Sequence, residues 1–166
     1  MSSTEVTLRD EGPWTRFMDM HTGGYTKVKP YDKILIQAPE AEARAVFYNR
    51  FDHNPDAVAC TCCGSDYSVS ESESLAQATA YDRNCAYVYT DPEGNERDDC
   101  PANDWRAAKE AGWSGRYTEA KGSYGLAVTP LDEYLARPDV LVIHASEISS
   151  DERTADMREH GYVWVD

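Results

Sequence analysis

The feature that most constrains the fold of this chain is the shortness of its apolar runs. The longest is VLVI at 140–143, and Gly, Pro, Asn and Asp residues punctuate the sequence between the runs. Four residues suit a strand and fall far below the roughly 20 that a membrane-spanning helix needs. The sequence therefore predicts short strands joined by frequent turns, with no membrane segment.

Several short segments have the character of strands. The clearest are KILIQA at 33–38, CAYVYT at 85–90, DVLVIHA at 139–145 and GYVWVD at 161–166. CAYVYT alternates small apolar residues with tyrosines and is followed by DPEGN, a turn-forming sequence, so a hairpin is expected there. Two shorter extended pieces, AVAC and DYSVS, flank a cluster of cysteines, which predicts a tight turn at TCCG.

Helices are predicted at four places. Pro39 stands at a favourable first position for a helix over 39–52, which should stop before Pro55. Ser70 and Glu73 have the spacing of a capping box, which predicts a second helix running to residue 83. Two further short helices are expected at 103–111 and 129–138. The Gly- and Pro-rich stretch 12–31 is expected to be irregular.

This mixture of strands and helices indicates an α+β fold. We expect a single domain over residues 1–166, with a mainly antiparallel sheet and two or three helices packed on one face. Residues 1–12 are expected to form a loose N-terminal segment or an edge strand. A chain of 166 residues buries roughly two thirds of its unfolded surface, so no disulfide or metal is obligatory for stability.

The negative charge is unevenly distributed along the chain. The net charge is −14, but residues 1–50 sum to zero, whereas residues 51–110 contribute −9 and residues 111–166 contribute −5. Such a field repels nucleic acid and anionic lipid and attracts basic protein surfaces. We therefore expect no direct nucleic-acid or membrane binding and a basic protein as partner. The alternative is that the acids serve only as a solvated surface.

Cys60, Cys63 and Gly64 form a C-x-x-C-G sequence, which resembles half of a zinc site. A turn of this kind lets two thiolates reach one ion, and Cys85 and Cys100 are available to complete a tetrahedral set. These two lie fifteen positions apart and form no second C-x-x-C pair. The alternative is a set of reduced, buried cysteines, since the N-terminus lacks a signal peptide and a cytoplasmic location is expected.

His53 is a possible substitute ligand for the zinc ion. It lies seven residues before Cys60, near the end of the helix predicted at 39–52. A histidine in this position also interacts favourably with the last carbonyl groups of a helix, so a capping role is the alternative.

An enzymatic alternative rests on two other histidines. His144 and Ser146 have the H-x-S spacing that two-histidine phosphoesterases use to bind phosphate and move protons, whereas His21 is followed directly by Thr22. The other interpretation of His144 is a histidine on a partly buried strand. The sequence holds neither a G-x-S-x-G nucleophile elbow nor a G-x-x-x-x-G-K-[ST] phosphate-binding loop.

Three stretches resemble a family of small acidic proteins encoded by bacteriophages. They are FMDMHTGG, CTCCGSDYSV followed by ESLAQATAYDR, and the closing GYVWV, and the resemblance covers most of residues 16–90. It carries over no catalytic residue. It implies expression in the cytoplasm of an infected bacterium, where small acidic phage proteins bind and disable host machinery.

These observations favour a non-enzymatic binding protein. Its acidic surface is expected to engage a basic host protein, as an anti-defence or host-takeover inhibitor that could imitate DNA, with a zinc turn as a structural element. Two alternatives stay open: a small hydrolase or phosphoesterase that uses His21 and His144 or a Cys/His metal site, and a protein of virion assembly. The sequence leaves the oligomeric state open.

Overall fold

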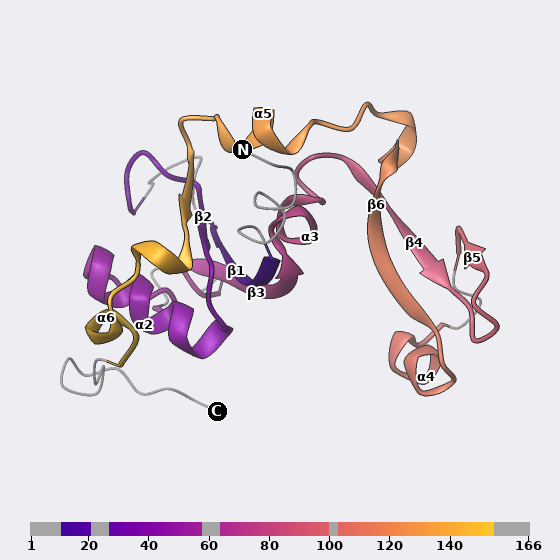
Figure 1. Cartoon of the computed structure of the whole chain (residues 1–166), viewed down its shortest axis with the longest axis horizontal. Helices are drawn as coiled ribbons and strands as arrows, with labels where there is room; N and C mark the ends of the chain where they lie inside the picture. The colour runs from indigo at the N-terminus through magenta and orange to yellow at the C-terminus, as the bar shows by residue number, and fades with distance from the viewer. Residues whose placement is uncertain (1–10, 21–26, 58–63, 100–102, 155–166) are drawn as a thin grey trace. The chain divides into compact units, whose positions relative to one another are not determined.

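The structure, a computed structural model, describes residues 11–20, 27–57, 64–99 and 103–154, and it separates into two compact units (Figure 1). One unit comprises Met1–Ala78 with Leu135–Asp166, and the other comprises Thr79–Tyr134. The α+β class and the mainly antiparallel pairing are confirmed, although the strands form two sheets where one was expected. That both units form one domain stays a prediction.

The first unit is built on a four-stranded sheet with the order β3-β1-β2-β7. Its strands are β1 (Glu11–Asp19), β2 (Lys33–Ile36), β3 (Tyr67–Ser74) and β7 (Val140–Ile143). The apolar runs KILI and VLVI form β2 and β7, which pair in parallel, and the other pairs are antiparallel. Both runs therefore form strands, as predicted. No helix in the described part of the chain is long and apolar enough to cross a membrane.

Strand β1 corrects the prediction of irregular structure at residues 12–19, whereas residues 27–31 form neither helix nor strand, as predicted. It lies between β3 and β2, and its Trp14 and Phe17 side chains are fully buried. The pairing register with β3 shifts between Glu11 and Trp14, which accommodates Gly12 and Pro13 at the start of the strand. Burial against two neighbouring strands thus outweighs the local signal for a turn. The strand predicted at 161–166 lies outside the described residues.

Helix α2 (Glu40–Phe51) covers one face of this sheet and confirms the predicted helix. The helix begins directly after Pro39 and ends at Phe51. The next residue, Asp52, adopts the left-handed conformation with φ 50°, which is typical of a helix end. The Phe47 ring stacks on Phe17 of β1 with the ring centroids 4.6 Å apart. The buried core consists of Phe17, Ile34, Ile36, Ala38, Ala43, Val46, Phe47, Tyr67 and Ile143.

The capping box predicted at Ser70 and Glu73 is wrong, because both residues belong to β3. Ser70 pairs with Arg16 of β1, so its backbone takes part in the sheet. The helix α3 starts later, spans Leu75–Thr79, and receives its cap from Ser74, whose Oγ accepts a hydrogen bond from Gln77 N at 3.2 Å. Pairing with β1 therefore decided where this helix begins.

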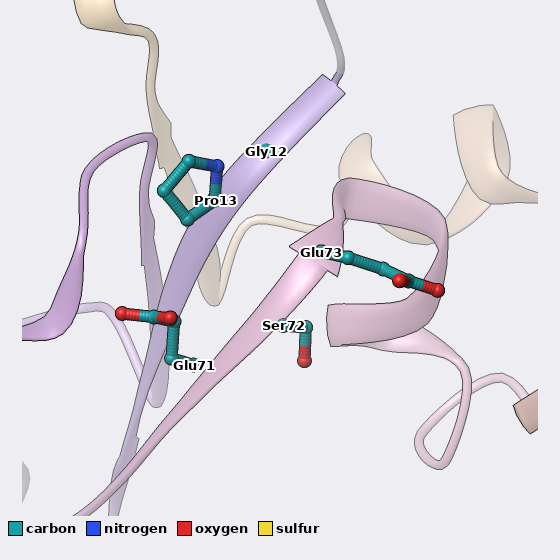
Figure 2. Close-up of a pocket in the computed structure, with 5 residues that line it drawn as sticks. All are labelled: Gly12, Pro13, Glu71, Ser72 and Glu73. Atoms are coloured by element: carbon teal, nitrogen blue, oxygen red, sulfur yellow. The ribbon is translucent and has the colours of Figure 1, made fainter. Parts of the chain in front are cut away.

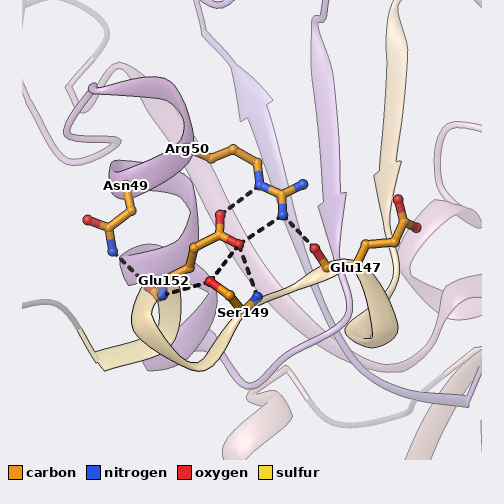
Figure 3. Close-up of polar contacts among 5 residues, drawn as sticks. All are labelled: Asn49, Arg50, Glu147, Ser149 and Glu152. Carbon is orange, nitrogen blue, oxygen red and sulfur yellow. Dashed lines mark hydrogen bonds and ion pairs between the residues drawn. The ribbon is translucent and has the colours of Figure 1, made fainter.

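The chain after β7 folds back onto α2. It forms the short helices η2 (Ala145–Glu147) and α6 (Ser150–Thr154), and α6 lies beside α2 in Figure 1. Asn49 Nδ2 donates to the Glu152 carbonyl oxygen at 2.7 Å, which joins the two helices (Figure 3).

The second unit has a three-stranded antiparallel sheet with the order β5-β4-β6. The hairpin predicted after residue 90 is confirmed, because β4 (Cys85–Thr90) pairs with the two-residue strand β5 (Glu96–Arg97). The third strand, β6 (Ser114–Gly122), was not predicted from the sequence. The remaining elements are α4 (Trp105–Glu110), η1 (Ser123–Gly125) and α5 (Leu131–Leu135).

Candidate functional site

The acidic charge of the second unit is concentrated in one stretch. Residues 91–104 carry six acids and one base, a net charge of −5. The rest of Thr79–Tyr134 carries five acids and five bases, so it is neutral. The excess charge therefore comes from the β4–β5 turn, from β5 and from the segment that leads to α4.

Asp91 organises the turn between β4 and β5. Its side chain is 5% exposed, and one carboxylate oxygen accepts hydrogen bonds from the N–H groups of Glu93 and Asn95 at 3.1 and 2.8 Å. Arg97 Nε donates to the other oxygen at 3.0 Å. The bond from the Asn95 backbone, together with Arg97, lowers the pKa of Asp91. Arg97 therefore binds Asp91 at the start of the turn that precedes it.

An open cavity of about 690 Å³ lies beside this turn, and we call it the acidic groove. It is lined by Asp91, Glu93, Glu96, Arg97, Asp98, Asp99 and Trp113. Two of these acids face cations of β6, since Lys121 Nζ donates to Asp98 at 2.6 Å and Arg116 lies 3.6 Å from Glu96. The lining still holds five carboxylates against one arginine, a composition that attracts cationic groups.

One face of the second sheet is aromatic. This face carries Tyr87, Tyr89 and Tyr117, and the Trp105 ring of α4 packs against Tyr89; we call these four residues the aromatic face. The Tyr87 ring centroid lies 4.9 Å from that of Tyr117 and 5.3 Å from that of Tyr89, in edge-to-face arrangements. Tyr87 is 39% exposed, whereas both of its neighbours in β4 are buried. Strand β4 therefore directs its tyrosines away from the buried side of the sheet.

The aromatic face adjoins the acidic groove through Arg97. Directly paired residues of antiparallel strands project from the same face of a sheet, and Tyr89 pairs with both Arg97 and Gly115. A Cβ atom on Gly115 would clash with the Tyr87 hydroxyl oxygen, so the missing side chain leaves room for that ring. The tyrosines and the arginine of the groove consequently share one surface.

His53, the predicted substitute zinc ligand, is paired with Asp66. Its Nε2 lies 3.1 Å from Oδ2 of Asp66, whose side chain is 2% exposed. A carboxylate oxygen accepts hydrogen bonds, so Nε2 is the donor atom of this pair. The C-cap residue of α2 is Asp52 and His53 follows it directly, so a favourable interaction of His53 with the end of the helix stays a prediction.

Further buried polar groups lie next to this pair. Lys27 Nζ contacts Asp19 Oδ1 at 2.8 Å and lies 5.8 Å from the centroid of the Tyr67 ring. Burial raises the pKa of Tyr67, and the Asp19 carboxylate raises it further, so the phenol stays neutral. These paired groups hold the adjacent ends of β1 and β3 together, where Asp19 and Tyr67 are partners in the pairing register.

Of the four cysteines predicted to bind zinc, only Cys85 lies among the described residues. Cys60, Cys63 and Cys100 lie outside the described residues, as do Cys62 and all of the predicted TCCG turn except Gly64. Cys85 is a free thiol at the start of β4, and it is 3% exposed. Burial raises the pKa of Cys85, and the positive charge of Arg83 offsets this in part. No group of three or more potential metal ligands occurs among the described residues.

Of the two histidines on which the phosphoesterase alternative depends, only His144 lies in the described part of the chain. His21 lies outside the described residues, and His144 starts η2, where its backbone N–H donates to Glu147 Oε1 at 3.0 Å. The His144 ring packs edge-on against Trp14, with centroids 5.4 Å apart. This environment agrees with the interpretation of His144 as a partly buried histidine at a strand end.

A second cavity, of about 380 Å³, lies at the β1–β3 edge (Figure 2). Its lining residues are Gly12, Pro13, Glu71, Ser72 and Glu73. Figure 2 shows the carboxylates of Glu71 and Glu73 directed away from each other, and Glu71 Oε1 accepts a hydrogen bond from Glu40 N at 2.7 Å. The polar groups do not converge on a common point, so the acidic groove is the stronger candidate.

The local sequence at 91–95, DPEGN, predicts only a turn. The charge count of residues 91–104 was the signal that could have singled out this stretch. Comparison of the chain with models of protein families, with curated proteins and with solved structures finds no match.

Proposed function

We infer that this protein acts by binding, and that its acidic groove engages a basic surface of a partner protein. The observation that carries this proposal is an open cavity lined by five carboxylates and one arginine, within a stretch, residues 91–104, of net charge −5. Carboxylates gathered at one place create a local field that speeds association with a cationic partner and favours it over others.

The resemblance to phage proteins supports a bacterial host protein as the partner. Proteins that bind nucleic acid carry the basic surfaces that an acidic groove fits. In this proposal the protein occupies such a surface in place of DNA and inhibits the host protein, as an anti-defence or host-takeover factor.

The test is capture of bacterial proteins by the tagged full-length chain at low and at high salt. Two variants with the same change in charge are compared: Glu93→Gln with Asp99→Asn in the groove, and Asp132→Asn with Glu133→Gln on α5. All four residues are exposed. We expect basic proteins to be captured at low salt, released by high salt, and lost in the groove variant only. Salt-insensitive capture, or equal loss in both variants, contradicts the proposal.

A small hydrolase is the second candidate function, and the His53–Asp66 pair favours it. Histidines that bind catalytic metals commonly donate their other ring N–H to a carboxylate, as the Nε2 of His53 does here. Elemental analysis of the purified protein tests this candidate. It requires a bound metal ion that is lost on His53→Ala, and retention of the metal in that variant contradicts it.

A further inference from the structure

We propose that the aromatic face binds arginine side chains of a basic partner segment whose remaining charge lies in the acidic groove. This inference rests on the proposed function, and it names the chemistry by which the partner is recognised. The aromatic face meets the groove at Arg97, because Tyr89 and Arg97 are paired residues on adjacent strands and project from the same face of the sheet.

The first argument is that this face already accommodates a cation of the chain itself. Lys109 Nζ lies 5.9 Å from the centroid of the Trp105 ring, within the range of a cation–π interaction. Burial raises the pKa of Tyr87, and the neighbouring Tyr89 and Tyr117 raise it further. The Tyr87 ring is therefore neutral and presents an electron-rich face to a cation.

The second argument concerns the charge around the face. The net charge of −5 in the adjoining stretch 91–104 is complementary to a basic segment. The same charge opposes single-stranded nucleic acid, which otherwise stacks well on tyrosines. It also opposes a second copy of this chain, because that copy brings the same acidic surface. Charge complementarity therefore favours a basic protein segment over single-stranded nucleic acid and over a second copy of this chain.

The third argument favours arginine over lysine. A guanidinium group is planar, stacks on aromatic rings and forms two parallel hydrogen bonds with one carboxylate. Tyr87 and Tyr117 offer the rings, and the groove offers carboxylates in Glu93 and Asp99. An ammonium group gains the electrostatic attraction but loses most of the stacking.

Titration of the full-length protein with oligoarginine and oligolysine peptides of equal length tests this inference. The variant expected to lose affinity is Tyr87→Leu with Tyr117→Leu. It removes two aromatic rings but keeps apolar side chains at both positions and leaves the net charge unchanged. Replacing both tyrosines by phenylalanine keeps the rings and should restore binding. Tyr81→Leu is the matched control, since Tyr81 is 70% exposed and belongs to the same unit but not to the aromatic face.

We expect oligoarginine to bind more tightly than oligolysine, and the double leucine variant to lose about three- to ten-fold in affinity for oligoarginine. The phenylalanine and Tyr81→Leu variants should bind like the wild type, with unchanged circular dichroism in all cases. If only the groove variant Glu93→Gln with Asp99→Asn loses affinity, the aromatic inference fails and the proposed function stands. If neither peptide binds, or if single-stranded DNA binds more tightly, both fail.

Discussion

The Arg50 guanidinium and the Glu152 carboxylate form a two-point ion pair between α2 and α6 (Figure 3). Nε lies 2.9 Å from Oε2, and Nη2 lies 3.0 Å from Oε1. Arg50 Nη2 also donates to the Glu147 carbonyl oxygen at 2.7 Å, while Ser149 N donates to Glu152 Oε1 at 3.0 Å. This network connects residues about a hundred positions apart in the sequence. It holds the chain that follows β7 against helix α2 within the first unit.

Arg50→Ala should therefore lower the free energy of unfolding of the first unit. We expect a loss of about 1 kcal/mol, because the geometry is bidentate but both side chains are partly exposed. Urea denaturation followed by circular dichroism measures the change. The control is Arg106→Ala on the exposed side of α4, and an equal effect of the two variants contradicts this role for Arg50.

The same ion pair predicts a dependence of stability on pH. The hydrogen bond from Arg50, with help from Ser149, lowers the pKa of Glu152 from 4.5 to about 2. A carboxyl group with a lowered pKa in the folded state stabilises it above pH 4.5, and this contribution is lost as the pH falls toward 2. The wild type should exceed Glu152→Gln in stability by about 1 kcal/mol at neutral pH, and the gap should close in acid. A gap that is constant with pH contradicts this prediction.

Lys27→Ala should have the largest effect on stability among these variants. The Lys27 and Asp19 side chains are 3% and 0% exposed, so removing the ammonium group leaves a buried carboxylate without its cation. The expected loss is about 3 kcal/mol by denaturant titration. Lys29→Ala, at an exposed neighbouring lysine, is the control. A loss no greater than that of the control shows that water or other groups compensate for the missing lysine.

Gly115→Ala should disturb the aromatic face without unfolding it. The new methyl group meets the outer end of the Tyr87 ring, which can rotate away, so the cost in stability should be about 1 kcal/mol. The near-ultraviolet circular dichroism of the tyrosines should change, and the affinity for oligoarginine should fall. An unchanged spectrum would show that the Tyr87 ring does not lie over this glycine.

The sequence predicted those elements whose signals are local. Pro39 marks the start of α2, and the apolar runs at 33–36 and 140–143 form β2 and β7. Strand β6 was missed because its sequence, SGRYTEAKG, shows no apolar alternation and most of its side chains are at least partly exposed. The helix predicted from Ser70 was placed too early because pairing with β1 competes with the capping signal.

The candidate site was less predictable, because it depends on contacts between distant parts of the chain. The turn at 91–95 was recognised, but the meeting of its acids with Trp113 depends on the fold of the whole unit. The alternation in CAYVYT predicted the strand that carries Tyr87, whereas Tyr117, which packs against Tyr87, comes from the strand that was not predicted. Likewise, nothing in the sequence around His53 indicates Asp66 as its partner.

The most direct test of the central claim is the affinity of the full-length chain for oligoarginine, measured by calorimetry over a series of salt concentrations. The comparison is between Glu93→Gln with Asp99→Asn and the matched variant Asp132→Asn with Glu133→Gln. We predict that affinity falls steeply with salt and that only the groove variant binds about ten-fold more weakly at low salt. Equal affinities of the two variants at every salt concentration would contradict the assignment of binding to the acidic groove.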